Sequence, residues 1–173
     1  MPPKRTKSPG SKAKILTPRR LAALRSRWAR AGRRVVFTNG VFDILHPGHV
    51  DLLERARLLG DALIVGVNTD ASARRLGKGS GRPVNRLADR CRVLAALACV
   101  DAVTSFGEDT PESLLEKLRP DVLVKGADYT VDQVAGRRYA GRVALVRLKK
   151  GYSTTSLIGR IERLGRKGGP PKE

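Results

Sequence analysis

The stretch from Val35 to His49, VVFTNGVFDILHPGH, constrains the fold of this chain more than any other. Its first residues, Val35 to Phe37, form a short apolar run that predicts a buried strand ending at Thr38-Asn39-Gly40. From Pro47 onward, apolar residues recur every three or four positions, which predicts an amphipathic helix with proline in its first turn. A strand, a glycine-bearing turn and a helix together present free backbone N–H groups and a positive helix end to an anion.

Two histidines, His46 and His49, lie at the predicted entrance of this helix. Their spacing allows both imidazoles to face a phosphate that the helix N-terminus holds. Two histidines could instead bind a metal, or they could simply pack or cap the helix. The chain has no other histidine and its cysteines lie elsewhere, which disfavours a metal site. We therefore interpret this segment as a phosphate site.

The net charge of +19 raises the question of nucleic-acid binding. Most of the excess lies at the ends, since residues 1–34 hold 12 Lys and Arg and no acidic residue, whereas residues 35–158 carry only +4. A basic arm rich in Pro, Gly and Ser is commonly disordered and touches polyanions without specificity. We expect flexible tails at 1–16 and 165–173 around one domain at 17–164. We do not expect specific nucleic-acid binding. The alternative function outside the enzymes is a nucleic-acid-binding protein that uses its basic N-terminal arm.

Nothing in the sequence predicts secretion or a membrane span. The N-terminal residues lack an apolar signal segment, and no window approaches 18 apolar residues. A basic amphipathic helix is predicted after Thr17; it could dock on a membrane or, more simply, cover the sheet. Cys91 and Cys99 are too few for a disulfide framework and are interpreted as reduced packing thiols. We expect a cytoplasmic protein without a membrane partner.

Apolar runs and amphipathic stretches alternate along the chain. After the first strand, further strands are predicted at 62–67, 102–106, 121–124 and 142–148. Helices are predicted from Pro18 to about Gly32 and at 47–59, 70–76, 86–100, 111–118, 131–136 and 153–164, with Asp70 as a cap. Because strands alternate with helices, we expect right-handed crossovers and a five-stranded parallel sheet.

Polar residues follow the predicted strands at four places. They are Thr38 to His49, Asn68 to Asp70, Lys125 to Asp128, and Ser153 to Thr155. Because the carboxyl ends of parallel strands line one crevice, these residues should converge. The loop from Gly77 to Asn85 adds Lys78 and Arg82, which suit either closure over phosphates or a plain solvated loop.

The same residues carry a resemblance to a known family. The segment from Gly40 to His49 fills every fixed position of the nucleotidyltransferase signature GxFDxxHxGH. From about Arg33 to Ile161 the chain resembles the heptose 1-phosphate adenylyltransferases, which complete ADP-heptose synthesis for lipopolysaccharide in Gram-negative bacteria. The similar stretches are FTNGVFDILHPGHVDLLERAR, VGVNTDASARRL, GRPVN, EDTPESLLEKLRPDVLVKGADYT and GYSTTSLI. The chain departs from the common pattern at Val41 and Arg86 and by an inserted Gly77.

This resemblance implies a single Rossmann-like α/β domain with helices on both faces of the sheet, and Mg²⁺-dependent use of ATP. It implies catalytic roles for His49, His46 and Lys78. Nucleotide binding is expected from Thr38, Asn39, Gly40, Val41, Phe42, Gly48, Arg90, Lys125, Gly126, Ser153, Thr154 and Thr155. Substrate binding is expected from Asp43, Asn68, Asp70, Arg82, Asp128 and Tyr129. No protein ligand is assigned to Mg²⁺, which would bind mainly through the ATP phosphates.

The resemblance further implies transfer of AMP from ATP to a heptose 1-phosphate, giving ADP-heptose and pyrophosphate. Cytidylyl transfer to a polyol phosphate is the nearest alternative. Leu148 weighs against it, because the glycerol-3-phosphate cytidylyltransferases carry arginine at that position. The expected partners are ATP and a sugar 1-phosphate. A homodimer is possible.

Overall fold

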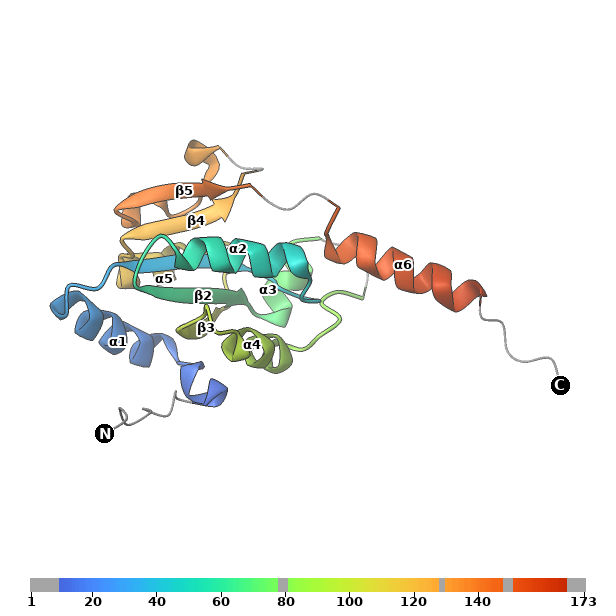
Figure 1. Ribbon diagram of the computed structural model, residues 1–173, viewed down its shortest axis with the longest axis horizontal. Coiled ribbons are helices and arrows are strands. Elements are labelled where there is room, and N and C mark those ends of the chain that lie inside the picture. The colour runs from blue at the N-terminus through green and yellow to red at the C-terminus, as the bar shows by residue number, and fades with distance from the viewer. Residues whose placement is uncertain (1–9, 78–80, 128–129, 148–150, 168–173) are drawn as a thin grey trace, which may run out of the picture.

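The computed structural model describes residues 10–77, 81–127, 130–147 and 151–167, and it has one parallel sheet covered by helices on both faces (Figure 1). The sheet has five strands in the order β3-β2-β1-β4-β5, and every neighbouring pair is parallel. Since the strand order reverses between β1 and β4, the carboxyl ends of these two strands flank a crevice. The predicted single-domain Rossmann-like fold is confirmed.

The strands lie close to the predicted runs, although the second and fourth extend one and two residues past their predicted ends and the fifth stops before its predicted end. They are β1 (Val35–Gly40), β2 (Ala62–Asn68), β3 (Ala102–Phe106), β4 (Val122–Gly126) and β5 (Arg142–Val146). The first strand ends at the predicted segment Thr38-Asn39-Gly40, but these three residues belong to the strand, because they pair in register with Val65, Gly66 and Val67 of β2. The Asn-Gly pair therefore completes the strand instead of breaking it.

Six α-helices and three short 3-10 helices accompany the sheet in the described chain. They are η1 (Ser11–Lys14), α1 (Pro18–Arg30), α2 (Pro47–Arg57), α3 (Asp70–Arg75), α4 (Leu87–Ala96), α5 (Glu112–Leu118), η2 (Val131–Gln133), η3 (Arg137–Tyr139) and α6 (Thr154–Lys167). Alternate residues of β1 and β2 separate two cores. Val36 and Leu63 pack with α2 and α4, whereas Phe37 and Ile64 pack with α1 and α5.

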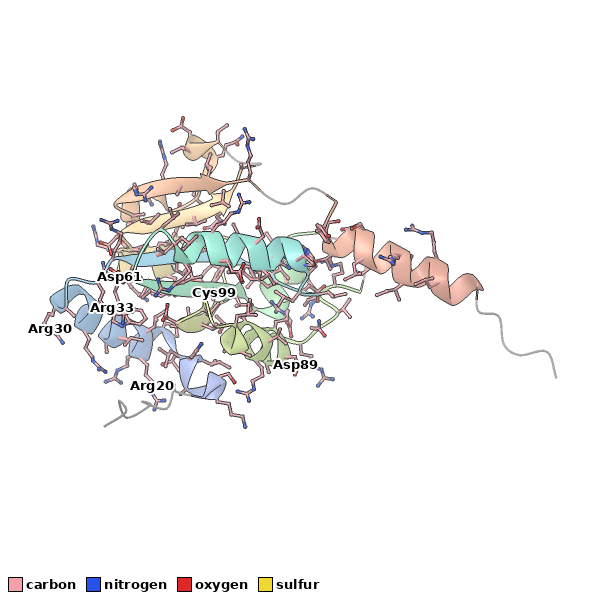
Figure 2. The ribbon with its side chains drawn as sticks, in the orientation of Figure 1. Arg20, Arg30, Arg33, Asp61, Asp89 and Cys99 are labelled. Carbon is pink, nitrogen blue, oxygen red and sulfur yellow. The ribbon has the colours of Figure 1, made fainter. Side chains whose placement is uncertain are left out.

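Helix α1 packs on the sheet, which is the simpler of the two roles predicted for it; the other was docking on a membrane. The Thr17 side chain accepts a hydrogen bond from the Arg20 N–H, which confirms the predicted cap. Leu21 and Trp28 are buried against the second core. Figure 2 shows Arg20 and Arg30 projecting from α1 away from the sheet. The basic face is thus the outer face of a helix that packs through its apolar side.

Residues 11–16 differ from the predicted flexible tail, because they bind the open edge of the sheet. Ile15 forms a parallel bridge with Val103 of β3, and the Leu16 N–H donates to the Val103 carbonyl at 2.8 Å. The Lys14 ammonium donates to the carbonyls of Leu97 and Val100 at 3.1 and 2.7 Å. These partners lie far away in the sequence, so composition alone could not reveal them. The described domain therefore begins before residue 17.

Replacing Lys14 by Met should lower the free energy of unfolding by about 2 kcal/mol, because two carbonyls lose a charged donor. Chemical denaturation of the full chain measures this difference. Lys12→Met is the matched control, since Lys12 is exposed in the same turn. Equal losses in the two variants would mean that the Lys14 contacts contribute nothing.

Three helix ends also differ from prediction. Thr69, not Asp70, caps α3, and its hydroxyl accepts from the Ser72 N–H. Helix α4 stops at Ala96 instead of Val100, because Leu97 turns to extended geometry and leads the chain back to β3. Helix α6 runs beyond the predicted end at Leu164 to Lys167.

Cys91 is buried and Cys99 half-buried, neither in a disulfide, and burial raises the pKa of both thiols. This environment agrees with the interpretation of both cysteines as packing residues.

Within the described part of the chain, no helix is long and apolar enough to cross a membrane.

Candidate active site

The turn between β1 and α2 brings both histidines to the carboxyl edge of the sheet. Phe42 adopts a left-handed conformation with φ of 49°, which bends the chain sharply after β1. His46 is the N-cap of α2, and Pro47 occupies the first helical turn as predicted. A Cβ at Gly48 would lie 3.2 Å from the His46 ring and from Tyr152 Cβ. The start of α2 at Gly48 is therefore packed closely between the His46 imidazole and the segment before α6.

The two imidazoles form a stacked pair. Their ring centroids lie 3.7 Å apart with an interplanar angle of 19°. Phe42 meets His49 edge-on, with centroids 5.2 Å apart. Two protonated imidazoles at this separation would repel each other strongly, so the pair favours at most one positive charge in the absence of an anion.

The surroundings of His46 favour its neutral form. Burial lowers the pKa of His46, and a backbone hydrogen bond only partly opposes this effect. The buried Nδ1 atom of His46 has no hydrogen-bond partner among the described residues, and the same holds for the buried Oδ1 of Asn39 at the end of β1. Buried polar atoms are normally satisfied, so each of these two atoms is available for a hydrogen bond to a ligand.

The lowered pKa of His46 predicts a specific dependence of stability on pH. Because the unfolded chain binds a proton to this residue more readily, the folded state should lose stability as the pH falls below about 6.5. In the His46→Gln variant that loss should be smaller. Unfolding free energies measured from about pH 8 to about pH 5 test this. Parallel curves for the two proteins would contradict it.

The start of α6 brings a second helix N-terminus to the same place. Tyr152 lies against Gly48, two residues before α6 begins at Thr154. Thr154 is buried, whereas Ser153 caps the helix through its hydroxyl, which accepts from the Ser156 N–H at 3.0 Å. Two helix N-termini thus meet beside the histidine pair, and each favours negative charge there.

Arg82 connects the signature segment with this second helix. Its guanidinium donates to the Asp43 carboxylate at 3.2 Å and to the Thr155 hydroxyl at 3.4 Å. Asp43 is buried and also accepts from the Asn85 N–H at 2.9 Å, while the Asn85 amide donates to the Asp43 carbonyl. Asp43 therefore holds the Arg82 loop against the signature.

Arg90 lies beneath the site with only 2% of its surface exposed. Its guanidinium donates to the carbonyls of Val41, Asn68 and Asn85 and to the Asp70 carboxylate. Burial acts to raise the pKa of Asp70, but hydrogen bonds from Arg90 and from a backbone N–H outweigh it, so the pKa falls. A nucleotide contact was expected from Arg90. That contact stays a prediction, and the structure shows that four donors of Arg90 join three loops around the site.

The other predicted residues divide into three groups. Thr38 is buried and donates to the Val124 carbonyl, and the Asn68 amide donates to Ser72, so both side chains serve the scaffold. Gly40, Lys125 and Gly126 end β1 and β4 at the crevice edge. Lys78, Asp128 and Tyr129 lie outside the described residues.

A metal site made of protein ligands does not appear in the described chain. No group of three or more His, Cys, Asp or Glu side chains in it is placed to hold a metal ion. Asp43 in the signature and Asp70 just after β2 each form an ion pair with an arginine. The donors present suit phosphate oxygens better than a cation.

Comparison with known proteins agrees with this phosphate-directed site. The model of the cytidylyltransferase-like family matches residues 37–163, which include both histidines and the first part of α6. The chain belongs to this family.

Two relatives narrow the position of the chain within the cytidylyltransferase-like family. The D-beta-D-heptose 1-phosphate adenylyltransferase of Bordetella bronchiseptica is 54% identical over 138 residues, covering 78% of this chain and 85% of that protein. The bifunctional protein HldE of Magnetococcus marinus is 59% identical over 140 residues, covering 79% of this chain. The chain spans 28% of the length of that bifunctional relative.

Solved structures show the same fold. The lipopolysaccharide core biosynthesis protein from Thermoplasma volcanium has a TM-score of 0.58 and 31% identity, covering 70% of this chain and all of that one. The pantoate-beta-alanine ligase from Francisella tularensis also has a TM-score of 0.58, at 15% identity, over 92% of this chain and 81% of that one.

Two residues of the cytidylyltransferase-like site were absent from the predicted set. Asn85 binds Asp43 through both its backbone and its side chain, and Tyr152 packs on Gly48. Both lie inside stretches that the resemblance contains, GRPVN and GYSTT, which was the available signal. Their contacts join segments far apart in the chain, so spacing alone could not assign them.

Proposed function

We propose that this chain transfers AMP from ATP to a heptose 1-phosphate, giving ADP-heptose and pyrophosphate. The observation that carries the proposal is the convergence of two helix N-termini on a stacked histidine pair. Such a site stabilises the negative charge of several phosphates at once. The name of the Bordetella relative supplies the acceptor, a heptose 1-phosphate, and the nucleotide group, adenylyl.

The proposed step is a direct in-line displacement. An oxygen of the sugar phosphate forms a bond to the α-phosphorus of ATP as the bond to the bridging oxygen of pyrophosphate breaks. A phosphate monoester is already an anionic nucleophile, so the step needs neither a covalent enzyme intermediate nor a strong base. The protein then contributes positioning and stabilisation of developing charge.

The residue roles follow from their places around the crevice. We assign His49, His46 and the first turn of α2 to the α-phosphate, since they share one helix entrance. Ser153, Thr154 and Thr155 at the start of α6 hold the other ATP phosphates, with Arg82 beside Thr155. Asn39, Lys125 and Gly126 end the two strands at the switch point and line the nucleotide site. Lys78 and Asp128 keep their predicted roles as proposals.

Magnesium would arrive with ATP as part of the substrate. The described residues offer phosphate-binding donors and no cluster of metal ligands, so the ion fits the site through ATP phosphate oxygens. Bound there, it would neutralise phosphate charge. The same proposal places the reaction in the cytoplasm, in precursor synthesis for lipopolysaccharide.

The decisive experiment measures pyrophosphate release from ATP with heptose 1-phosphates of both anomers and with other sugar and polyol phosphates. Turnover should require a heptose 1-phosphate. Release of pyrophosphate with a polyol phosphate and none with either heptose 1-phosphate would overturn the proposed acceptor.

Base choice gives a separate prediction. The enzyme should prefer ATP to CTP by at least about tenfold in kcat/KM, because a site that hydrogen-bonds one base leaves polar groups unpaired against another. The phosphate contacts are common to both nucleotides, so the preference must come from other loops around the crevice. Steady-state kinetics with one heptose 1-phosphate and either nucleotide tests it. Equal turnover would reject adenylyl specificity and leave the nucleotidyltransferase mechanism intact.

A further inference from the structure

Phe42 is unusual within the signature because its backbone is strained. Its φ of 49° lies in the left-handed region, and Phe42 and Arg119 are the two residues other than glycine with positive φ in the described part of the chain. Strain of this kind persists only where the surrounding structure holds it, and it collects at functional sites. Glycine would make the same bend without strain, so the bend alone does not explain a phenylalanine here.

The neighbouring structure determines where the Phe42 ring lies. A Cβ at Gly40 would lie 3.2 Å from the ring, so a larger residue at that position would push the ring aside. Only 6% of Phe42 is exposed, and the residue belongs to the core that β1 and β2 form with α2 and α4. The glycine and the phenylalanine of the signature therefore act together to place an aromatic ring where the core meets the histidine pair.

The Phe42 ring contacts His49 directly. Their ring centroids lie 5.2 Å apart at an interplanar angle of 61°, which is an edge arrangement of the kind that aromatic pairs prefer. His46 lies nearly parallel to the same imidazole, with centroids 3.7 Å apart and an angle of 19°. Because one neighbour is inclined to the His49 ring and the other is stacked on it, the two together limit the directions in which the imidazole can tilt. Without the Phe42 ring, the imidazole loses one of these two restraints.

We propose that Phe42 is a positioning residue for His49 in the reaction. This inference rests on the proposed function, which assigns His49 to the α-phosphate of ATP. The Phe42 ring does not have to touch a substrate, because its effect reaches the reacting atoms through the imidazole. A displacement of about 1 Å in such a group can lower the rate on the order of a hundredfold. The strained backbone of Phe42 is then retained because it directs a rigid ring against His49.

The simpler alternative is that Phe42 only fills the core. A cavity of about 70 Å³ lies beside Phe42 and is also lined by Leu45, Val93 and Leu94. Because this space adjoins the residue, packing in the core alone leaves room for the ring to shift. Packing of the core and positioning of His49 are therefore separable. A substitution that keeps an apolar side chain at this position can test which of them matters for catalysis.

Phe42→Leu keeps an apolar side chain and removes the flat ring. This variant should lower kcat about thirtyfold, while KM for ATP and for the sugar phosphate should change less than about threefold, because a misplaced imidazole affects the transition state most. Phe106→Leu is the matched control, since Phe106 is also 6% exposed but lies in the core that α1 and α5 cover. It should leave kcat within about threefold. A kcat of Phe42→Leu that matches that of Phe106→Leu would overturn the proposal.

A double-mutant cycle shows whether Phe42 acts through His49. In a chain that already carries His49→Ala, adding Phe42→Leu should lower the single-turnover rate less than about threefold, compared with about thirtyfold in the wild type. An undiminished loss in the His49→Ala chain would overturn the proposal, because Phe42 would then act independently of the imidazole. Phe42→Met carries the same expectations and replaces the leucine variant if that variant does not fold.

NMR tests the same contact without turnover. The chain has only two histidines, His46 and His49, so their ring resonances can be told apart. Phe42→Leu should shift and broaden the His49 ring resonances, whereas Phe106→Leu should leave them in place. His49 resonances that do not change in Phe42→Leu would overturn the proposal. If the wild type releases pyrophosphate with none of the sugar phosphates, the proposed function fails, and the NMR result still decides whether Phe42 orients His49.

Discussion

Replacing His49 by alanine should lower kcat at least about a hundredfold while the fold stays intact. His49 lies in the first turn of α2, stacked on His46 and edge-on to Phe42, so its position is fixed before a ligand binds. A donor held in this way contributes most when charge builds on the α-phosphate, and losing one such group typically costs about 3 kcal/mol. Single-turnover and steady-state kinetics with ATP and heptose 1-phosphate measure the effect.

The His49 variant needs two controls. Its thermal unfolding should match that of the wild type, and its affinity for ATP should change far less than kcat, because the contact strengthens in the transition state. His46→Ala serves as the matched comparison within the stacked pair and should cost less in kcat. Turnover of His49→Ala within about threefold of wild type would remove this residue from the mechanism.

Replacing Arg90 by methionine should lower the free energy of unfolding by about 3 kcal/mol or more. Methionine fills much of the space, but the carbonyls of Val41, Asn68 and Asn85 lose a donor, and the Asp70 carboxylate keeps only the hydrogen bond from the Leu87 N–H. Buried acceptors that lose a charged donor are costly to leave unsatisfied, and the Asp70 carboxylate also loses its ion pair. Denaturant unfolding measures the loss.

Arg92→Met is the matched control for Arg90, since Arg92 lies on the same helix and is exposed. It should change stability by less than about 0.5 kcal/mol. Arg90→Met should also lower kcat and raise KM together, because three site loops lose a common anchor. Normal stability of Arg90→Met would show that the buried hydrogen bonds make no net contribution.

Much of the fold could be predicted because its determinants are local. The apolar runs at β2 and β3 and the Thr17-Pro18 helix start are set by neighbouring residues. Errors arose where a distant segment decides the outcome. Gly40 stays in β1 because β2 lies beside it, and residues 11–16 are ordered because β3 has an open edge. Neither partner can be inferred from the local sequence.

The candidate site shows the same division. His46, His49 and the hydroxyls before α6 could be proposed from sequence, because a helix start and its polar residues are adjacent in the chain. The scaffold contacts of Arg90 could not be inferred in the same way. Its four acceptors come from segments up to 49 residues away, and only the folded chain brings them together. The sequence thus reveals residues that are adjacent at a helix start more readily than residues that join distant loops.

The segment at Ile15 and Leu16 bears on the behaviour of the protein at high concentration. An uncovered edge strand displays unpaired N–H and C=O groups and can recruit a strand from another molecule, which begins aggregation. Here the bridge from Ile15 and the hydrogen bond from Leu16 occupy the outer side of β3. A chain shortened to begin at Thr17 would keep its catalytic residues but expose this template. The short N-terminal segment therefore covers the edge of β3 and should reduce aggregation through that edge.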